Sequence, residues 1–169
     1  MQIINFPGMR VVVPSTQSYE QVVTALESML GRSDDALIAQ MAQQHASVEQ
    51  VMQAVKGMVG TSGLMIVARI EQGLLLSLLG KPKKAVLYVL ANPLVANTMF
   101  DHNTAIALYV PVRMAVYEDE HGSVSVAYDK PSSLLGQFED EQIAETAHMI
   151  DQKLEELATT AAGTNMNNQ

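Results

Sequence analysis

The chain has 169 residues, of which 48% are hydrophobic, and this length and composition suit one domain built around a single core. Its formal net charge of −8 argues against a nucleic acid or an anionic membrane surface as the main partner, because either would require a basic patch. The absence of cysteine excludes a disulfide framework, a thiolate nucleophile and a thiolate metal site.

The N-terminal residues do not have the pattern of a secretory signal. Residues 1–7 contain no cationic segment followed by an apolar run, and no stretch of the sequence reaches the ~20 apolar residues that a bilayer requires. We therefore expect a cytoplasmic protein that does not bind membranes.

The first third of the chain predicts a strand followed by helices. A β-branched run at 9–13 is typical of a strand. Ser18 and Ser47 each precede a glutamine by three residues, which is the spacing of a capping box at a helix start. The methionines that follow recur at helical spacing, and we interpret them as core filler rather than as a soft-metal site. The predicted helices cover residues 18–30, 33–44 and 47–59.

Residues 57–63 are rich in glycine and resemble a phosphate-binding loop at first sight. Such a loop must follow a strand and open a helix, so that free amide groups point at the phosphate. Here the segment follows a predicted helix and precedes a predicted strand at 64–71, which a short helix at 72–80 follows. A helix end and a connecting loop explain the glycines better than a nucleotide site does.

The strand predicted at 85–91 is apolar on both faces. Val86, Tyr88 and Leu90 alternate with residues that are equally apolar, so we expect other elements to cover the strand on each side. Asn92 and Pro93 then end it, because asparagine is a good N-cap and proline suits the first turn of a helix. Asn92 and Pro93 therefore predict a helix at 93–100. This structural role explains the pair without any catalytic or ligand-binding function.

A long strand is predicted at 104–117, with two different faces. One face is continuously apolar and should pack on helices; it consists of Ile106, Leu108, Val110, Val112, Met114 and Val116. The other face carries small residues beside Tyr109, Arg113 and Tyr117, and forms a shallow amphipathic surface. Pro111 cannot donate a hydrogen bond to a neighbouring strand, so a bend or a sheet edge is expected there.

A hairpin turn is predicted at 118–122. Gly122 allows the positive φ that such a turn needs, and Glu118, Asp119 and His121 surround it. On a tight exposed turn these side chains cannot converge as a closed ligand set, so we predict no metal site and no cofactor. The partner strand follows and ends at Asp129 and Pro131.

The last predicted helix covers residues 137–161, with an apolar stripe that should lie across the sheet. Residues 163–169 are polar and rich in asparagine, and we predict a disordered tail there. The domain therefore spans residues 1–162.

The segment from Lys84 to Leu135 resembles the domain-of-unknown-function 302 family, whose members have no established activity. The resemblance depends on the order and spacing of several short motifs rather than on any one of them. These are Asn92-Pro93, Val110-Pro111, the strand end at Glu118-Asp119, the turn at Gly122 and the closing Pro131.

The resemblance implies an α+β fold of the TATA-binding-protein class, in which a strand and a helix precede four antiparallel strands and a closing helix. It implies two layers with a curved, mainly antiparallel sheet covered by helices, and the helices within 33–59 are an insertion relative to this pattern. Members of the family are known as dimers. The order of elements predicted from the residues alone agrees with this arrangement, and fold analogy does not import DNA binding.

Two functions from different classes remain open. The first is a noncatalytic homodimeric module that binds a small amphipathic ligand or a protein partner over Tyr109, Pro111, Arg113, Tyr117 and Asp129. The second is an enzyme that uses Arg113, Tyr109 or Tyr117, and Asp129 for acid-base chemistry on a small molecule. We favour the module, because the sequence offers no set of nucleophile, base and orienting group. The same face is equally explained as a dimer interface alone.

Overall fold

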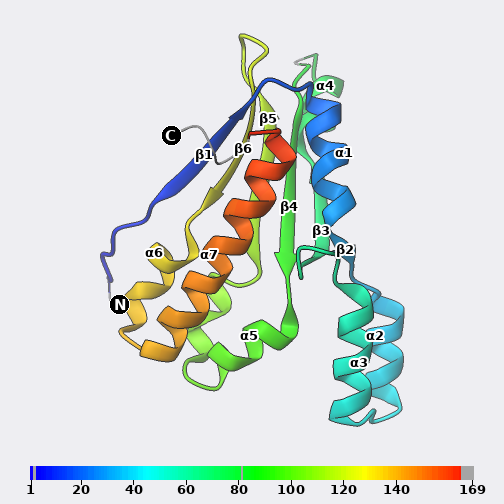
Figure 1. The fold of residues 1–169 in the computed structure, drawn as a ribbon, viewed down its shortest axis with the longest axis vertical. Coiled ribbons are helices and arrows are strands. Elements are labelled where there is room, and N and C mark those ends of the chain that lie inside the picture. Colours follow the sequence, from blue (N-terminus) through cyan, green and yellow to red (C-terminus); the bar gives the residue numbers. More distant parts are fainter. Residues whose placement is uncertain (2, 81, 165–169) are drawn as a thin grey trace.

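Six strands form one open sheet in the computed structural model, which describes residues 1, 3–80 and 82–164 (Figure 1). The strand order is β1-β6-β5-β4-β3-β2, and every neighbouring pair is antiparallel except β2 with β3. The α+β fold class with two layers is confirmed, although the sheet is uncurled rather than curved. The strands are β1 (Arg10–Ser15), β2 (Gly31–Arg32), β3 (Met65–Glu71), β4 (Ala85–Ala91), β5 (Val112–Glu118) and β6 (Val124–Asp129).

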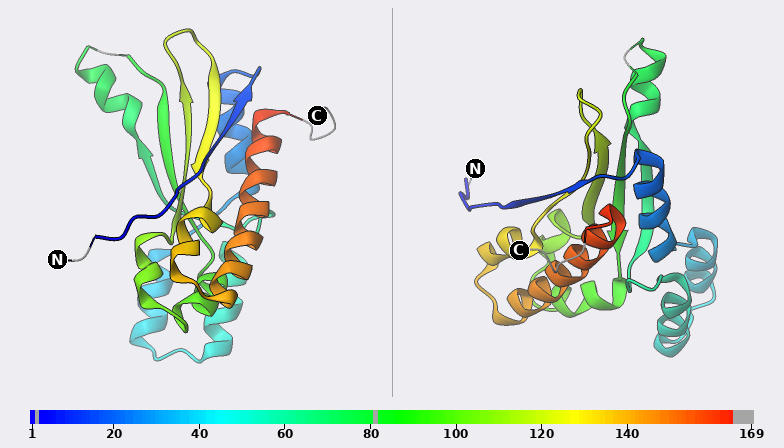
Figure 2. Two further views of the ribbon diagram at one scale, coloured as in Figure 1. Left: turned by 90° about the vertical axis from the view of Figure 1, so that its left-hand side faces the viewer. Right: turned by 45° about the horizontal axis from the view of Figure 1, so that its top comes forward.

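Two long helices, α1 and α7, pack against each other and against one face of the sheet (Figures 1 and 2). Ser18 caps α1 with the predicted capping box, and Asp140 caps α7 by accepting a hydrogen bond from the amide of Ile143. The helices are α1 (Tyr19–Met29), α2 (Asp35–Gln43), α3 (Val48–Met58), α4 (Gln72–Leu78), α5 (Pro93–Phe100), α6 (Pro131–Leu135) and α7 (Glu141–Ala162), with 3₁₀ turns η1 (Thr104–Leu108) and η2 (Gly136–Phe138).

The main core lies between this helical layer and the covered face of the sheet. Alternate residues of β4 and β5 point into it, and α1 and α7 contribute their apolar stripes. Its fully buried side chains include Val22, Leu26, Val86, Tyr88, Leu90, Met114, Val116 and Leu154.

The prediction of a strand at 104–117 is wrong in its first half. Residues 104–108 form η1, because the side chain of Asn103 accepts a hydrogen bond from the amide of Ala105 at 2.9 Å and starts a helical turn. The Val110–Pro111 peptide bond is cis, and β5 begins only at Val112. Leu108, predicted to be buried, is 82% exposed.

The end of the chain also differs from the prediction. Glu139 has a positive φ of 52° and separates α6 and η2 from α7, so the final helix begins at Glu141 rather than at 137. Gly163 ends α7 in the left-handed conformation, and the amide of Thr164 donates to the carbonyl of Thr159. The rest of the predicted disordered tail, residues 165–169, lies outside the described residues.

Helices α2 and α3 extend beyond one end of the sheet and have a small core of their own (Figure 1). Val55 and Met58 of α3 pack there on Met65 of β3, and Met41 of α2 lies against them. Met41 and Met58 therefore fill space in this small core, as predicted, whereas Met52 of the same stripe is 40% exposed. The same cluster reaches Leu94 of α5 and so joins the helical pair to the body of the domain.

The glycine-rich segment connects α3 to β3 and permits a close contact between two backbones. A Cβ placed on Gly31 would lie 1.8 Å from the carbonyl oxygen of Met58 and 2.7 Å from the amide nitrogen of Gly60. The amides of Gly31 and Gly60 both donate to the carbonyl of Leu64, at 3.0 and 2.9 Å. These glycines serve packing, and the predicted loop is confirmed.

We expect Gly31→Ala to lower the free energy of unfolding by about 3 kcal/mol or more, because the new methyl group must displace backbone atoms. Gly57→Ala is the matched control, since Gly57 lies in α3 and no atom from another part of the chain lies within 4 Å of the position that its methyl group would take. It should stabilise the protein by about 0.5 to 1 kcal/mol through helix propensity. Urea denaturation measures both; equal effects of the two substitutions would contradict the close contact.

Candidate functional site

The sheet has one face that the helices leave uncovered. On β4, Val86, Tyr88 and Leu90 are buried in the core, whereas Leu87 and Val89 point the other way and are only half-buried. The prediction that both faces of this strand are covered is therefore wrong for the single chain, because α1 and α7 lie on the same side. The uncovered side is called the open face and includes Arg10, Val12, Ala68, Ile70, Leu87, Val89, Arg113, Ala115, Tyr117, Ser125, Ala127 and Asp129.

The open face is apolar along its middle. Leu87 of β4 pairs with Ala115 of β5, which in turn pairs with Ala127 of β6. At its margins Val12 and Ile70 are 48% and 46% exposed. A continuous band of aliphatic side chains thus crosses five strands without a covering layer.

A charged triplet occupies one end of the open face. Asp129 of β6 accepts a hydrogen bond from Nε of Arg10 at 2.9 Å, and Nη2 of Arg113 lies 3.7 Å from its other oxygen. Both arginine side chains are about two-thirds exposed. The hydrogen bond and the charge of Asp129 raise the pKa of Arg10 above its ordinary value. Two guanidinium groups against one carboxylate leave this corner locally positive on an acidic protein.

The structure arranges the five predicted site residues around two adjacent hollows that share Arg113 and Asp129. Tyr117 lines the hollow on the open face. Tyr109 and Pro111 line the other, beside Leu108 and Leu134. Tyr109 does not lie on the strand face as predicted, because it follows η1 and packs edge-on against two other aromatic rings. Its ring centroid lies 5.9 Å from that of Phe6 and 6.1 Å from that of Phe138.

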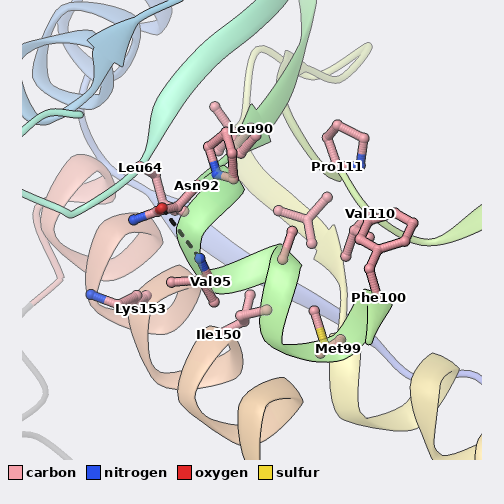
Figure 3. Close-up of a pocket in the computed structure, with 14 residues that line it drawn as sticks. Leu64, Leu90, Asn92, Val95, Met99, Phe100, Val110, Pro111, Ile150 and Lys153 are labelled. Atoms are coloured by element: carbon pink, nitrogen blue, oxygen red, sulfur yellow. Dashed lines mark hydrogen bonds between the residues drawn. The ribbon is translucent and has the colours of Figure 1, made fainter. Parts of the chain in front are cut away.

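The residues of the family-like motifs separate into two groups in space. Asn92, Pro93 and Pro111 line an apolar pocket of about 230 Å³ between α5, α7 and the ends of β4 and β5 (Figure 3). Glu118, Asp119 and Gly122 form the hairpin between β5 and β6, while Pro131 starts α6. In the hairpin, the carboxylate of Asp119 accepts hydrogen bonds from the amides of His121 and Ser123, which lowers its pKa.

Aliphatic side chains form most of the wall of this pocket. Figure 3 shows Leu90 and Asn92 from the end of β4, Val95 and Met99 from α5, and Ile150 from α7 around it. The amide group of Asn92 is already engaged: its oxygen accepts from the backbone of Leu94 and Val95, and its nitrogen donates to the carbonyl of Gly63. Asn92 therefore shapes the pocket, and its predicted role as the N-cap of α5 is confirmed.

A polar network beneath α1 was not predicted from the sequence. Glu27 of α1 accepts hydrogen bonds from the hydroxyl of Tyr88 and from Nε of Arg69, each at 2.7 Å. Arg69 also pairs with Glu71, to which the hydroxyl of Tyr19 extends at 3.5 Å. The sequence signal that could have indicated this network is the pair Arg69 and Glu71. These residues stand two apart on a strand and so share one face.

The surroundings of this network shift the pKa values of its members. Burial opposes ionisation of Glu27, but the hydrogen bonds from Arg69 and Tyr88 outweigh it and hold the pKa of the carboxyl below its ordinary value. Burial and the charge of Glu71 raise the pKa of Tyr19 to about 12. Since each charged group has an opposite partner, we interpret the network as the attachment of α1 to the sheet.

Three of the four histidines lie in separate places. His102 contacts Asp140 at 3.0 Å, His121 lies on the exposed hairpin, and His148 is 3.7 Å from Asp151. Among the residues that the structure describes, no three histidine or acidic side chains are grouped as a metal site. Nor does any helix within the described ranges combine the length and the apolar character needed to cross a bilayer.

Comparison with known proteins identifies the class of this fold. The model of the family described as "Domain of unknown function DUF302" matches residues 38–161. The chain belongs to this family, which confirms the resemblance carried by its motifs. The fold is also similar to the crystal structure of an uncharacterized conserved DUF302 protein from Bacillus stearothermophilus, with a TM-score of 0.63 and 16% sequence identity, over 90% of this chain and 97% of the other. None of the curated proteins compared matches the chain.

We expect Glu27→Gln to destabilise the protein by about 1 kcal/mol at neutral pH, because Arg69 and Tyr88 lose a charged partner at a half-buried position, while Arg69 keeps its pair with Glu71. The folded-state pKa of Glu27 lies below its unfolded value of 4.5, so its contribution is present above that pH and is lost as the pH falls through the lower, folded-state value. The gap in unfolding free energy between wild type and variant should therefore narrow below about pH 4.5.

Glu49→Gln in the first turn of α3 is the control for this prediction, since Glu49 is exposed. Denaturant unfolding at a series of pH values measures all three proteins. A gap that stays constant down to the acid limit would show that the ionisation of Glu27 does not stabilise the fold.

Proposed function

We propose that the protein is a cytoplasmic, noncatalytic homodimeric module, and that two copies pair through the open face of the sheet. The observation that carries this proposal is the central strand β4, which is apolar on both sides but covered on one. A strand of this composition is typical of a sheet with a layer on each face. A second copy supplies the missing layer.

The size of the open face fits such a contact. Five strands of six or seven residues, spaced about 4.8 Å apart with a rise of about 3.3 Å per residue, project an area of roughly 500 Å². Pairing two such faces removes on the order of 1,000 Å² from solvent, which is the lower limit for a specific interface. Two aligned sheets pack about 10 Å apart, with their side chains interdigitating.

The charged triplet supports pairing about a two-fold axis. In an isologous contact each copy presents the same patch. The corner with Arg10 and Arg113 in one copy would therefore meet the open face of the other copy. Arg113 is exposed and only loosely paired with Asp129, which leaves most of its donors free for an acidic or carbonyl group of the second copy. Tyr117 lies on the same face, and tyrosine and arginine are enriched in interfaces.

The enzyme alternative has less support from the geometry. Asp129, the candidate acid-base group, already faces two guanidinium groups. Tyr109 packs between two aromatic rings and lines a different hollow from Tyr117. These residues do not converge on one point where a small molecule would react.

We expect Leu87→Glu to convert the dimer into a folded monomer, because the substitution places two like charges in the apolar centre of the contact. Leu108→Glu is the matched control: Leu108 is 82% exposed and lies outside the open face, so this variant should remain dimeric. Analytical ultracentrifugation gives the oligomeric state, and circular dichroism shows that both variants are folded. A wild type that is monomeric at high concentration would contradict the proposal and make a small amphipathic ligand or another protein the occupant of the open face.

A further inference from the structure

We propose that the pocket beneath α5 binds a small carboxylic acid with a medium-length aliphatic chain. In this arrangement the chain lies inside the pocket, and the carboxylate lies at its rim beside Lys153 of α7 (Figure 3). The pocket is on the helix-covered side of the sheet, so the inference does not depend on pairing through the open face.

The interior of the pocket selects an apolar group. Leu90 and Met99 form its floor and are fully buried, while the accessible wall comes from apolar side chains such as Val95, Ala96 and Phe100. The polar atoms of Asn92 are engaged by the backbone. Water has few hydrogen-bond partners in such a space, so its displacement by an apolar group is favourable. A molecule with an aliphatic chain is therefore favoured over a sugar or a nucleotide.

The volume of the pocket limits the length of the aliphatic chain that the ligand can carry. The pocket opens to solvent and has a volume of about 230 Å³. At ~30 Å³ for a water-sized group, it accommodates about eight such groups. An acid of about eight carbons fits with its carboxylate at the rim.

Lys153 provides charge complementarity for the carboxylate. Its ammonium group donates one hydrogen bond, to the carbonyl of Ser62 at 3.3 Å, and an ammonium has three donors. Among the described residues, no carboxylate forms an ion pair with this half-buried cation. Figure 3 shows Lys153 on one side of the pocket and Phe100 on the other; the aliphatic stem of Lys153 faces the pocket, and its nitrogen lies at the outer rim, turned away from the interior. A cation beside an apolar pocket matches an anion that carries an aliphatic chain.

Isothermal titration calorimetry with sodium octanoate tests the proposal on the full chain, with 1-octanol as the neutral probe of the same length. We expect saturable one-site binding of octanoate, with octanol bound more weakly. Lys153→Met should weaken octanoate binding by about threefold to tenfold and leave octanol unchanged, because it removes the charge but keeps the length of the side chain. Lys56→Met, at an exposed position in the last turn of α3, is the matched control and should change neither.

Substitutions at two positions of α5 test where the aliphatic chain of the ligand lies. Ala96 lines the pocket, so Ala96→Phe should abolish binding of both probes by filling the space; Ala96→Leu is the milder variant if the first does not fold. Asn97→Phe, at the adjacent exposed position, should leave binding unchanged.

The proposal is overturned if octanoate shows no saturable binding below ~10 mM. It is also overturned if Asn97→Phe impairs binding as much as Ala96→Phe does, or if Lys153→Met affects octanol and octanoate equally. Each result is independent of the oligomeric state, which sedimentation measures separately.

Discussion

The structure depends on one feature, which is that β4 carries apolar side chains on both of its faces. The face with Val86, Tyr88 and Leu90 is covered by α1 and α7, whose stripes complete the main core. The opposite face, with Leu87 and Val89, remains half-buried in the single chain. Since the chain supplies no second layer over β4 within its described residues, the composition of this strand argues for an external partner. The same strand thus determines the fold and directs the functional proposal.

The sequence predicted the fold wherever a local signal acts alone. Ser18, Ser47 and Asn92 each start a helix at the predicted position, because a side-chain cap satisfies free amides whatever the tertiary context. The pattern at 104–111 misled because alternating apolar residues also fit a short 3₁₀ turn followed by an extended link. Asn103 decided the outcome by capping that turn, and Leu108 moved to the surface. Hydrophobic alternation over a short segment cannot distinguish these two conformations.

The candidate site was predictable only in part, and for a physical reason. Arg113, Tyr117 and Asp129 were placed together because neighbouring antiparallel strands bring alternate residues onto one face. Arg10 was not included, since its approach to Asp129 depends on β1 pairing with β6 across more than one hundred residues of sequence. The network of Glu27, Arg69 and Tyr88 likewise joins a helix to two strands. Contacts of this kind arise from topology, which no local pattern encodes.

The open face and the pocket beneath α5 lie close together on the same two strands but belong to opposite sides of the sheet. Asn92 ends β4 and caps α5, and its bond to the carbonyl of Gly63 fixes this corner against the start of β3. Pro111 borders both the pocket and the hollow beside Arg113. The motif residues Asn92, Pro93 and Pro111 therefore share one structural place: they end β4, start α5 and lead into β5. The pocket is a hollow at this corner whose floor, Leu90 and Val112, is already buried, and the hydrogen bonds of Asn92 fix α5 as one of its walls.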